Sequence, residues 1–177
     1  MIRIPASLRK KFARIELLLC DVDGVLTDGT VWMGSGAETK RFHIRDGLGL
    51  RVLQKQGVKV GWISRRPSPA TSARAEDLKI DFLHQGDHDK VGAIDEILSR
   101  TGMNWSQVCF VGDDIVDLGA LKRAGVSVAV ADASPEVRRK VDYVTRMSGG
   151  RGAVREVVEI ILHSQGKWSQ VVKEYSS

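Results

Sequence analysis

The chain has 177 residues, of which 42% are hydrophobic and 28% are charged. This length and composition suit one folded domain with a full core and exclude a disordered chain. The net charge is +5, and the basic residues are scattered apart from residues 9–11 and 137–140, so a nucleic-acid partner is not expected.

Two further features of the sequence indicate the cellular compartment in which the protein acts. Cys20 and Cys109 lie inside apolar runs, which favours small core residues over a disulfide or a metal pair. Residues 1–14 are basic and amphipathic, and no apolar run approaches the about 18 residues that a membrane span needs. We therefore expect a protein of the reducing cytoplasm with no membrane partner.

Hydrophobic periodicity and turn residues predict the elements of the chain. In chain order they are helix 5–13, strand 15–20, strands 30–33 and 40–44, helix 46–56, strand 58–63, helix 69–78, strand 80–83, helix 89–100, strand 108–111, helix 115–124, strand 126–130, a helix that starts at 134–135, strand 142–145 and helix 153–163. Asp46 and Ser68 are the expected N-caps of their helices. Strands that alternate with helices predict an α/β fold, a Rossmann-like parallel sheet with helices on both faces, in a single domain of residues 1–177.

One pair of strands departs from this alternation. Strands 30–33 and 40–44 are separated by turn residues at 34–37 and predict a β-hairpin within an insertion of about residues 29–45. The hairpin would expose four apolar side chains: Val31, Trp32, Met33 and Phe42. A contact between subunits and a cover over the chain's own sheet both account for such a surface.

Two carboxylates end the first predicted strand. Asp21 and Asp23 follow the apolar run 17–20 and precede Gly24. Ligands bind at the carboxyl ends of strands in open α/β sheets, so both side chains are placed for a ligand. Carboxylate oxygens suit Mg²⁺, which keeps several waters that a phosphate can replace. A polar exit from a strand is the simpler explanation of this pair taken alone.

More polar side chains follow the later strands or lie just beyond them. They are Ser64, Lys90, and Asp113 with Asp114 and Asp117. On a parallel sheet these positions converge with the first pair on one crevice, and together they describe a phosphoryl-transfer site.

The chemistry of such a site assigns a role to each group. Lys90 and a Mg²⁺ ion held by Asp21 and Asp113 would neutralise the phosphoryl charge, and Ser64 would donate a hydrogen bond to it. Asp21 is placed to attack phosphorus, because carboxylates form aspartyl-phosphates. Asp23 would protonate the leaving alcohol and later activate water.

The order of these motifs resembles that of the haloacid dehalogenase-like hydrolases and covers most of the chain. The finer similarity is to the 3-deoxy-D-manno-octulosonate 8-phosphate phosphatase group. It rests on four stretches: DVDGVLTDG at 21–29, FHIRDGLG at 42–49, VAVADA at 128–133 and YVTRMSGGRGAVRE at 143–156.

The resemblance implies a Mg²⁺-dependent phosphatase of lipopolysaccharide precursor synthesis without a large cap domain. It implies a homotetramer in which the hairpin and the glycine-rich segment 149–152 help to close a neighbouring subunit's site. Asp21 would be nucleophile and metal ligand, Asp23 acid, base and carbonyl ligand, and Asp113 the second carboxylate ligand. Asp114 and Asp117 would support the metal site.

The resemblance also implies substrate contacts for Arg66, Lys90 and Arg151. One departure concerns the second motif, where the group has Thr-Gly-Arg and this chain has Ser64, Arg65 and Arg66. A left-handed backbone at Arg65 would be strained, whereas an ordinary backbone would leave Arg65 able to bind a second anionic group. The resemblance extends to phosphatases that act on nine-carbon sialic-acid-type sugar phosphates, so a nine-carbon 9-phosphate is an alternative to the favoured eight-carbon substrate.

Two further interpretations belong to other functional classes. A signalling receiver domain uses a similar set of residues, but there the acidic pair precedes the acceptor aspartate, whereas here the Asp-x-Asp pair comes first. A catalytically impaired relative that serves as an interaction module is the second, and Arg65 is its main support. Transfer of the phosphoryl group to another sugar would need a lid, for which no segment is large enough.

Overall fold

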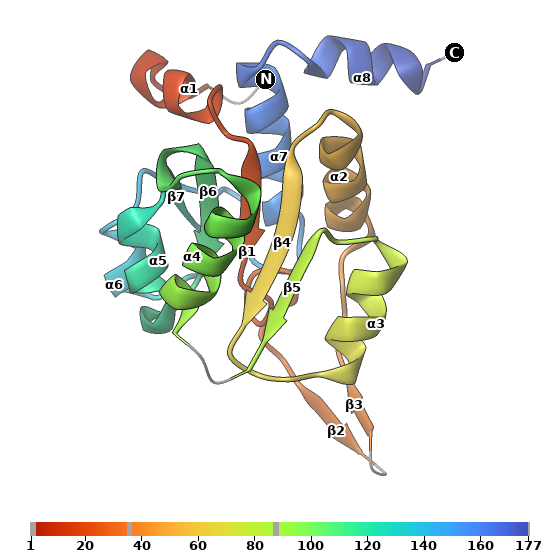
Figure 1. The fold of residues 1–177 in the computed structure, drawn as a ribbon. Helices are drawn as coiled ribbons and strands as arrows, with labels where there is room; N and C mark the ends of the chain where they lie inside the picture. Colours follow the sequence, from red (N-terminus) through yellow and green to blue (C-terminus); the bar gives the residue numbers. More distant parts are fainter. Residues whose placement is uncertain (1–2, 35–36, 87–88, 177) are drawn as a thin grey trace.

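The computed structural model describes residues 3–34, 37–86 and 89–176 (Figure 1). Its centre is a sheet of six strands in the order β5-β4-β1-β6-β7-β8, and every neighbouring pair is parallel. The strands are β1 (Leu17–Cys20), β4 (Lys59–Ser64), β5 (Phe82–Gln85), β6 (Val108–Gly112), β7 (Val126–Ala129) and β8 (Tyr143–Val144). The predicted parallel sheet is confirmed.

The central strand β1 explains why its sequence is apolar without alternation. All four of its residues are fully buried. Strands covered on both faces have no solvent side on which a polar residue could lie. Leu18 pairs with Val60 of β4 on one side and with Cys109 of β6 on the other, so β1 lies between these two strands.

Eight α-helices are assigned in the described part of the chain. They are α1 (Ala6–Phe12), α2 (Ile44–Lys55), α3 (Pro69–Asp77), α4 (Lys90–Thr101), α5 (Leu118–Arg123), α6 (Pro135–Arg138), α7 (Ala153–Ser164) and α8 (Trp168–Glu174). Helix α2 packs on α7 on one side of the sheet, and α4 packs on α5 on the other (Figure 1). Helices therefore cover both faces, as predicted.

The helix starts agree with the predictions at one position and differ at another. Ser68 caps α3, since its hydroxyl accepts a hydrogen bond from the Thr71 amide. The prediction for Asp46 is wrong: α2 begins at Ile44, with His43 at the N-cap. Asp46 lies in the first turn, where its carboxylate binds backbone amides of another helix.

Helix α8 was not among the predicted elements. It is short, and Val171 is its one fully buried residue among those described. A helix of this length depends on packing against the rest of the chain rather than on its own sequence pattern, which explains why periodicity did not indicate it.

The hairpin is present, but its second strand differs from the prediction. Strands β2 (Trp32–Gly34) and β3 (Ala37–Thr39) are antiparallel, and the residues at 35–36 in the predicted turn lie outside the described part. The predicted strand 40–44 is wrong, because this stretch leads directly into α2. Figure 1 shows the hairpin protruding beyond the ends of β4 and β5.

The apolar side chains of the hairpin region have two different environments. Trp32 and Met33 are exposed, at 67% and 79% of their surface. Phe42 is partly buried instead, and its ring stacks on Trp62 of β4 with centroids 6.0 Å apart. The predicted exposure of Phe42 is therefore wrong, whereas that of Trp32 and Met33 is confirmed.

The two cysteines are free and fully buried, which confirms their prediction as core residues. Burial raises the pKa of both thiols, so they are neutral in the folded chain. Within the described ranges, no helix has both the length and the apolar composition that a membrane crossing requires.

Candidate active site

Asp21 directly follows β1 at the carboxyl end of the sheet. Its backbone amide donates a hydrogen bond of 2.9 Å to the carbonyl of Val111 in β6, which continues the pairing of the two strands. The side chain is nearly buried, with 10% of its surface exposed. Asp21 therefore starts the loop after β1 with its carboxylate in a restricted space.

Lys90, the first residue of α4, lies beside Asp21. Its Nζ is 2.8 Å from Oδ1 of Asp21 and donates a hydrogen bond of 2.6 Å to Oδ1 of Asp117. Burial alone would lower the pKa of Lys90, but the two carboxylates hold it above its usual value. This explains a cation in the first helical turn, where the helix dipole disfavours it.

Asp117 connects this lysine to the loop after β6. Its Oδ2 accepts hydrogen bonds from the amides of Asp113, at 2.9 Å, and Asp114, at 3.4 Å. Both oxygens of Asp117 are thus engaged by groups of the chain. Asp114 itself is exposed and binds the amide of Ile115 at 2.8 Å, so it shapes the loop rather than facing the other carboxylates.

Three carboxylates converge at this point. Oxygens of Asp21, Asp113 and Asp117 lie within 4.8 Å of one another. Oδ1 of Asp113 is buried and has no hydrogen-bond partner among the described residues. Oxygens without a donor beside other carboxylates are suited to a hard divalent cation.

The crowding of these carboxylates changes their protonation. Burial, followed by repulsion from Asp21 and Asp117, raises the pKa of Asp113 to about 8. Burial and repulsion from Asp117 raise the pKa of Asp21 to about 6, even though Lys90 opposes the shift. A bound cation would favour the ionised form of both groups.

Gly24 allows Asp113 to reach this position. A Cβ atom at Gly24 would lie 2.2 Å from Oδ2 of Asp113, and the backbone there has φ +91°. Glycine tolerates this conformation and leaves the space that the carboxylate fills. The loop after β1 and the loop after β6 can therefore approach each other.

Asp23 lies outside the three-carboxylate cluster. Its Oδ1 is 2.8 Å from Nζ of Lys40, and its Oδ2 accepts hydrogen bonds of 3.3 Å from Nε and Nη2 of Arg66. Its carboxylate therefore faces the hairpin and the loop after β4. The predicted metal contact through the Asp23 carbonyl stays a prediction.

Ser64 ends β4 and is buried. Its hydroxyl accepts a hydrogen bond from the Arg66 amide at 3.2 Å and donates one to the Arg66 carbonyl at 3.1 Å. The described residues with a left-handed backbone are Lys79 and glycines, so Arg65 does not adopt the strained conformation. The replacement of glycine at this position is therefore compatible with the turn.

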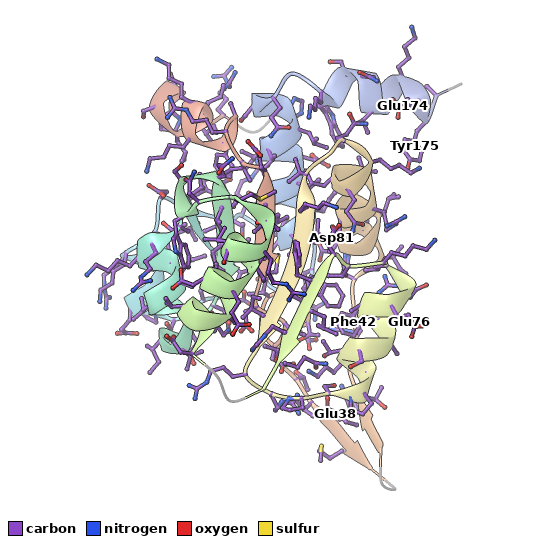
Figure 2. All side chains as sticks on the ribbon, in the orientation of Figure 1. Glu38, Phe42, Glu76, Asp81, Glu174 and Tyr175 are labelled. Carbon is purple, nitrogen blue, oxygen red and sulfur yellow. The ribbon has the colours of Figure 1, made fainter. Side chains whose placement is uncertain are left out.

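Glu38 and Lys40 were not singled out from the sequence, although they contact predicted site residues. Glu38 binds Arg66 and accepts a hydrogen bond of 2.5 Å from the Ser68 hydroxyl. Figure 2 shows it at the base of the hairpin, near the start of α3. The only signal in the sequence was an acidic and a basic residue close together in the hairpin, a pattern that is common on surfaces.

Arg151 lies in a different environment from the aspartates. It is exposed and lines a groove of about 510 Å³ whose other basic or ionisable members include His43, Arg45, Arg146 and Arg155. The aspartates Asp21, Asp23 and Asp113 do not line this groove. Its predicted contact with substrate stays a prediction.

The glycine-rich segment packs on the chain's own loop after β1. The Gly150 amide donates a hydrogen bond of 2.9 Å to the carbonyl of Val25. A Cβ at Gly149 would lie 1.7 Å from the carbonyl oxygen of Gly24. Gly149 and Gly150 therefore rest on their own chain's loop after β1, and the expected cover over a neighbouring subunit's site stays a prediction.

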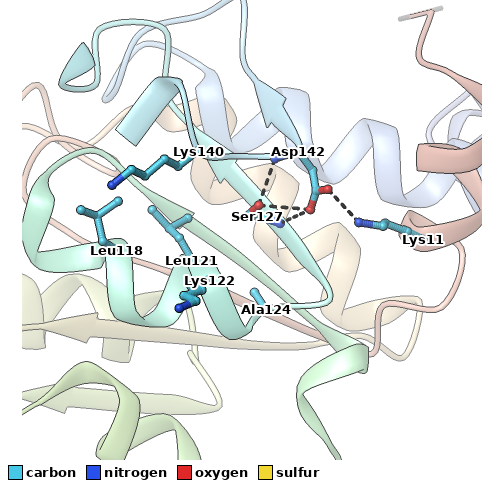
Figure 3. Close-up of a pocket in the computed structure, with 8 residues that line it drawn as sticks. All are labelled: Lys11, Leu118, Leu121, Lys122, Ala124, Ser127, Lys140 and Asp142. Atoms are coloured by element: carbon cyan, nitrogen blue, oxygen red, sulfur yellow. Dashed lines mark hydrogen bonds and ion pairs between the residues drawn. The ribbon is translucent and has the colours of Figure 1, made fainter. Parts of the chain in front are cut away.

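The cavity in Figure 3 is not part of this site. It measures about 520 Å³ and its lining includes Lys11, Ser127 and Asp142, which are joined by hydrogen bonds and an ion pair. Ser127 and Asp142 lie at the amino ends of β7 and β8, the opposite edge of the sheet from the carboxylates. No residue predicted for phosphoryl transfer lines it.

Comparison with known proteins agrees with this arrangement. Residues 65–157 match the family model described as haloacid dehalogenase-like hydrolase. The 3-deoxy-D-manno-octulosonate 8-phosphate phosphatase KdsC of Yersinia pestis is 45% identical over 159 residues, covering 89% of this chain and 85% of the relative. The KdsC of Escherichia coli K12 is 42% identical over 93% of this chain and 88% of its own length.

Solved structures extend the likeness to the fold. A 3-deoxy-D-manno-octulosonate 8-phosphate phosphatase from Moraxella catarrhalis, in complex with magnesium ion, phosphate ion and KDO, superposes with a TM-score of 0.93 at 36% identity, covering 96% of this chain and 98% of that one. The Yersinia pestis phosphatase superposes with a TM-score of 0.91 at 44% identity, covering 93% and 89%. The chain belongs to the haloacid dehalogenase-like hydrolases and, within them, to the 3-deoxy-D-manno-octulosonate 8-phosphate phosphatase group, and it is a phosphomonoester hydrolase.

Proposed function

We propose that this enzyme hydrolyses 3-deoxy-D-manno-octulosonate 8-phosphate to the free sugar acid and inorganic phosphate, with Mg²⁺ as cofactor and an aspartyl-phosphate on Asp21. The observation that carries the proposal is the geometry around Asp21. Its carboxylate lies within 4.8 Å of those of Asp113 and Asp117, and Nζ of Lys90 lies 2.8 Å away. A nucleophile, a cation site and a fixed positive charge are thereby combined at the carboxyl end of the sheet.

In the first step, an oxygen of the Asp21 carboxylate attacks phosphorus. The new bond joins Asp21 to phosphorus, and the bond from phosphorus to the sugar oxygen breaks. The electron pair goes to the sugar oxygen, which takes a proton from Asp23. Lys90 holds the Asp21 carboxylate in place and offsets part of the phosphoryl charge.

In the second step, water attacks the phosphorus of the aspartyl-phosphate. Asp23, now ionised, takes the proton from the water, and the bond between Asp21 and phosphorus breaks. Inorganic phosphate and the Asp21 carboxylate result.

The residues suited to hold Mg²⁺ are Asp21 and Asp113, together with the backbone carbonyl of Asp23. Asp117 is less suited as a ligand, because its oxygens already bind Lys90 and the Asp113 amide. We assign it, with Asp114, to supporting the loop. When bound, the ion neutralises charge on the phosphoryl group and keeps both ligand carboxylates ionised.

For the rest of the substrate, we propose contacts with Ser64, Arg66 and Arg151. The side chain of Arg66 is 41% exposed although it binds Asp23 and Glu38, so solvent reaches part of it. Arg65 is exposed and adds a second cation after Ser64. A nine-carbon sialic-acid-type 9-phosphate is the alternative substrate.

We further propose that the chain is one catalytic domain that acts in the cytoplasm, as a homotetramer, in the synthesis of a lipopolysaccharide precursor. The exposed Trp32 and Met33 on the hairpin support a contact between subunits. Sedimentation of the enzyme and of a Trp32→Ser, Met33→Ser variant tests this. A wild-type monomer with full activity would contradict the tetramer.

The function is tested by phosphate release from a panel of sugar phosphates, with and without Mg²⁺. We expect Mg²⁺-dependent turnover that is highest for 3-deoxy-D-manno-octulosonate 8-phosphate and is lost in Asp21→Asn. Preference for nine-carbon acids would keep the mechanism and change the substrate. Absence of turnover with every sugar phosphate would favour a catalytically impaired interaction module.

A further inference from the structure

Lys40 is a buried cation that the mechanism above does not use. It follows β3, where the hairpin insertion returns to the body of the protein, and its side chain has no exposed surface. Its Nζ lies 2.8 Å from Oδ1 of Asp23 and donates a hydrogen bond of 3.1 Å to the Thr71 hydroxyl in α3. An ammonium group is rarely buried in this way unless its partners hold it there.

The carboxylate of Asp23 is held from two sides. Lys40 binds Oδ1, and the guanidinium of Arg66 binds Oδ2 through two hydrogen bonds of 3.3 Å. The two cations come from segments far apart in sequence, the hairpin and the loop after β4. Asp23 cannot rotate about its side-chain bonds without breaking at least one of these contacts.

Glu38 supplies the second negative charge beside Lys40 and Arg66, in addition to that of Asp23. Its Oε1 lies 3.7 Å from Lys40, and its Oε2 binds Arg66. The Ser68 hydroxyl donates a further hydrogen bond to it. Two cations thus face two carboxylates, so the buried charge of Lys40 is compensated without any group of the substrate.

This arrangement argues against one simpler role for Lys40. A lysine that binds the transferring phosphate would need to reach the space beside Asp21, whereas Lys40 is enclosed and Lys90 already occupies that position. A lysine that only stabilises the hairpin would leave the dependence of the rate on the leaving group unchanged, and the test below separates that role from positioning of Asp23.

We propose that Lys40 is a positioning residue for Asp23. It fixes the orientation in which Asp23 delivers a proton to the leaving oxygen as the bond from phosphorus to that oxygen breaks. The hairpin insertion thereby sets the geometry of the general acid. This inference rests on the proposed function, because it assumes that Asp23 protonates the leaving group.

The test uses the dependence of the rate on the leaving group. Phenyl phosphates with increasingly acidic phenols need progressively less protonation as the phosphorus–oxygen bond breaks. The ratio kcat/KM covers only the steps up to the aspartyl-phosphate, so water activation by Asp23 does not affect it. A plot of log kcat/KM against the pKa of the phenol therefore reports proton delivery.

We expect a shallow slope for the wild-type enzyme and a steep one for Lys40→Met and for the reference variant Asp23→Asn. In Lys40→Met, kcat/KM for phenyl phosphate should fall about 10²-fold, whereas for 2,4-dinitrophenyl phosphate the loss should be only about threefold. Lys59→Met is the matched control, because Lys59 is an exposed lysine paired with Asp81. Its slope should equal that of the wild type.

An equal loss for all phenyl phosphates in Lys40→Met would overturn the proposal, since phosphate binding or general stability would account for it. An unchanged rate with every substrate would overturn it as well. If circular dichroism shows that Lys40→Met does not fold, Thr71→Val replaces it. That variant removes the neutral partner of Lys40 and should steepen the slope by a smaller amount, and an unchanged slope there would overturn the proposal.

The two proposals fail in different ways. If the wild type hydrolyses phenyl phosphates with a shallow slope but not the octulosonate phosphate, the substrate is wrong and the role of Lys40 is still tested. If Asp23→Asn keeps the shallow slope, Asp23 is not the general acid and both the mechanism and this inference are wrong.

Discussion

Oδ1 of Asp46 in α2 accepts a hydrogen bond of 2.7 Å from the backbone amide of Arg155 at the start of α7. Its Oδ2 accepts a second one, of 3.2 Å, from the amide of Gly152. A residue from one helix thus caps the first turn of another. This contact fixes the end of the glycine-rich segment that supports the loop after β1.

Replacing Asp46 by alanine should therefore destabilise the protein by more than the loss of an interaction within α2 alone, because α7 also loses its cap. We expect a loss of about 1–3 kcal/mol in the free energy of unfolding, since one buried and one partly buried amide lose their acceptor. Urea denaturation measures it. Asp77→Ala removes a more exposed helical aspartate and should change stability by less than about 0.5 kcal/mol. Equal effects of the two substitutions would contradict the capping role.

A methyl group at Gly149 should separate the glycine-rich segment from the site loop. The added Cβ would lie 1.7 Å from the Gly24 carbonyl oxygen, a backbone atom that cannot move without shifting the loop. We expect Gly149→Ala to destabilise the protein by about 1–3 kcal/mol and to lower kcat.

The matched control is Gly92→Ala in α4. Nothing lies within 4 Å of a Cβ there, and the substitution in a helix should stabilise by about 0.5–1 kcal/mol. Thermal unfolding and phosphate release of both variants check the pair. A Gly149→Ala variant as active and stable as the wild type would show that the segment can move away without effect.

Removal of the cation beside Asp21 should affect both stability and rate. Lys90→Met leaves the Asp21 and Asp117 carboxylates without their shared partner, which should cost about 3–5 kcal/mol at neutral pH. Turnover should fall at least about 10²-fold, because the variant loses a fixed charge at the reacting phosphoryl group. The exposed Lys122 provides the control Lys122→Met, for which we expect neither effect. Unfolding should be measured at both pH 5 and pH 8, because the pKa of Asp21 is raised to about 6 and its protonation at the lower pH should reduce the difference.

The carboxylate cluster predicts how stability depends on pH in the absence of a divalent cation. The pKa of Asp21 is raised to about 6 and that of Asp113 to about 8, so the folded state holds protons that the unfolded state has released. Stability from these groups is fully present below about pH 4 and is lost as pH rises through 6 and 8. Thermal unfolding in a chelator should therefore show a decreasing melting temperature over this range.

Mg²⁺ should reverse part of this trend. It binds the ionised carboxylates, so its stabilising effect should increase from pH 5 to pH 8. Asp113→Asn removes the group with the more strongly raised pKa and should flatten the dependence measured in chelator. A Mg²⁺ effect that is equal at both pH values, or a chelator profile unchanged in the variant, would contradict this account.

Local signals in the sequence were enough for the six strands of the parallel sheet, for helices α1 to α7 and for the main carboxylates. The apolar run before Asp21 predicted a buried strand, and β1 is indeed buried because helices cover both faces of the sheet. The Ser68 cap was predicted from the preference for serine before proline at the start of a helix. The parallel sheet then brought Lys90 and Asp113 to Asp21, because carboxyl ends of parallel strands meet at one edge.

Other features depend on contacts between distant segments, which no local pattern contains. The local sequence predicts that Asp46 caps its own helix, yet its carboxylate binds amides more than 100 residues away. The local sequence predicts that Phe42 is exposed on the hairpin, yet its ring stacks on Trp62. Periodicity specifies which face of an element is apolar but not which group in space will satisfy a buried polar atom.

The sequence by itself therefore determined the α/β fold and the convergence of Asp21 and Asp113, because these follow from local patterning and from the geometry common to parallel sheets. The tertiary structure alone decided that Lys40 and Arg66 hold Asp23 and that Gly149 rests on Gly24. These relationships arise from the packing of the hairpin and the glycine-rich segment around the loop after β1. A buried charge takes its partner from whatever the fold places beside it.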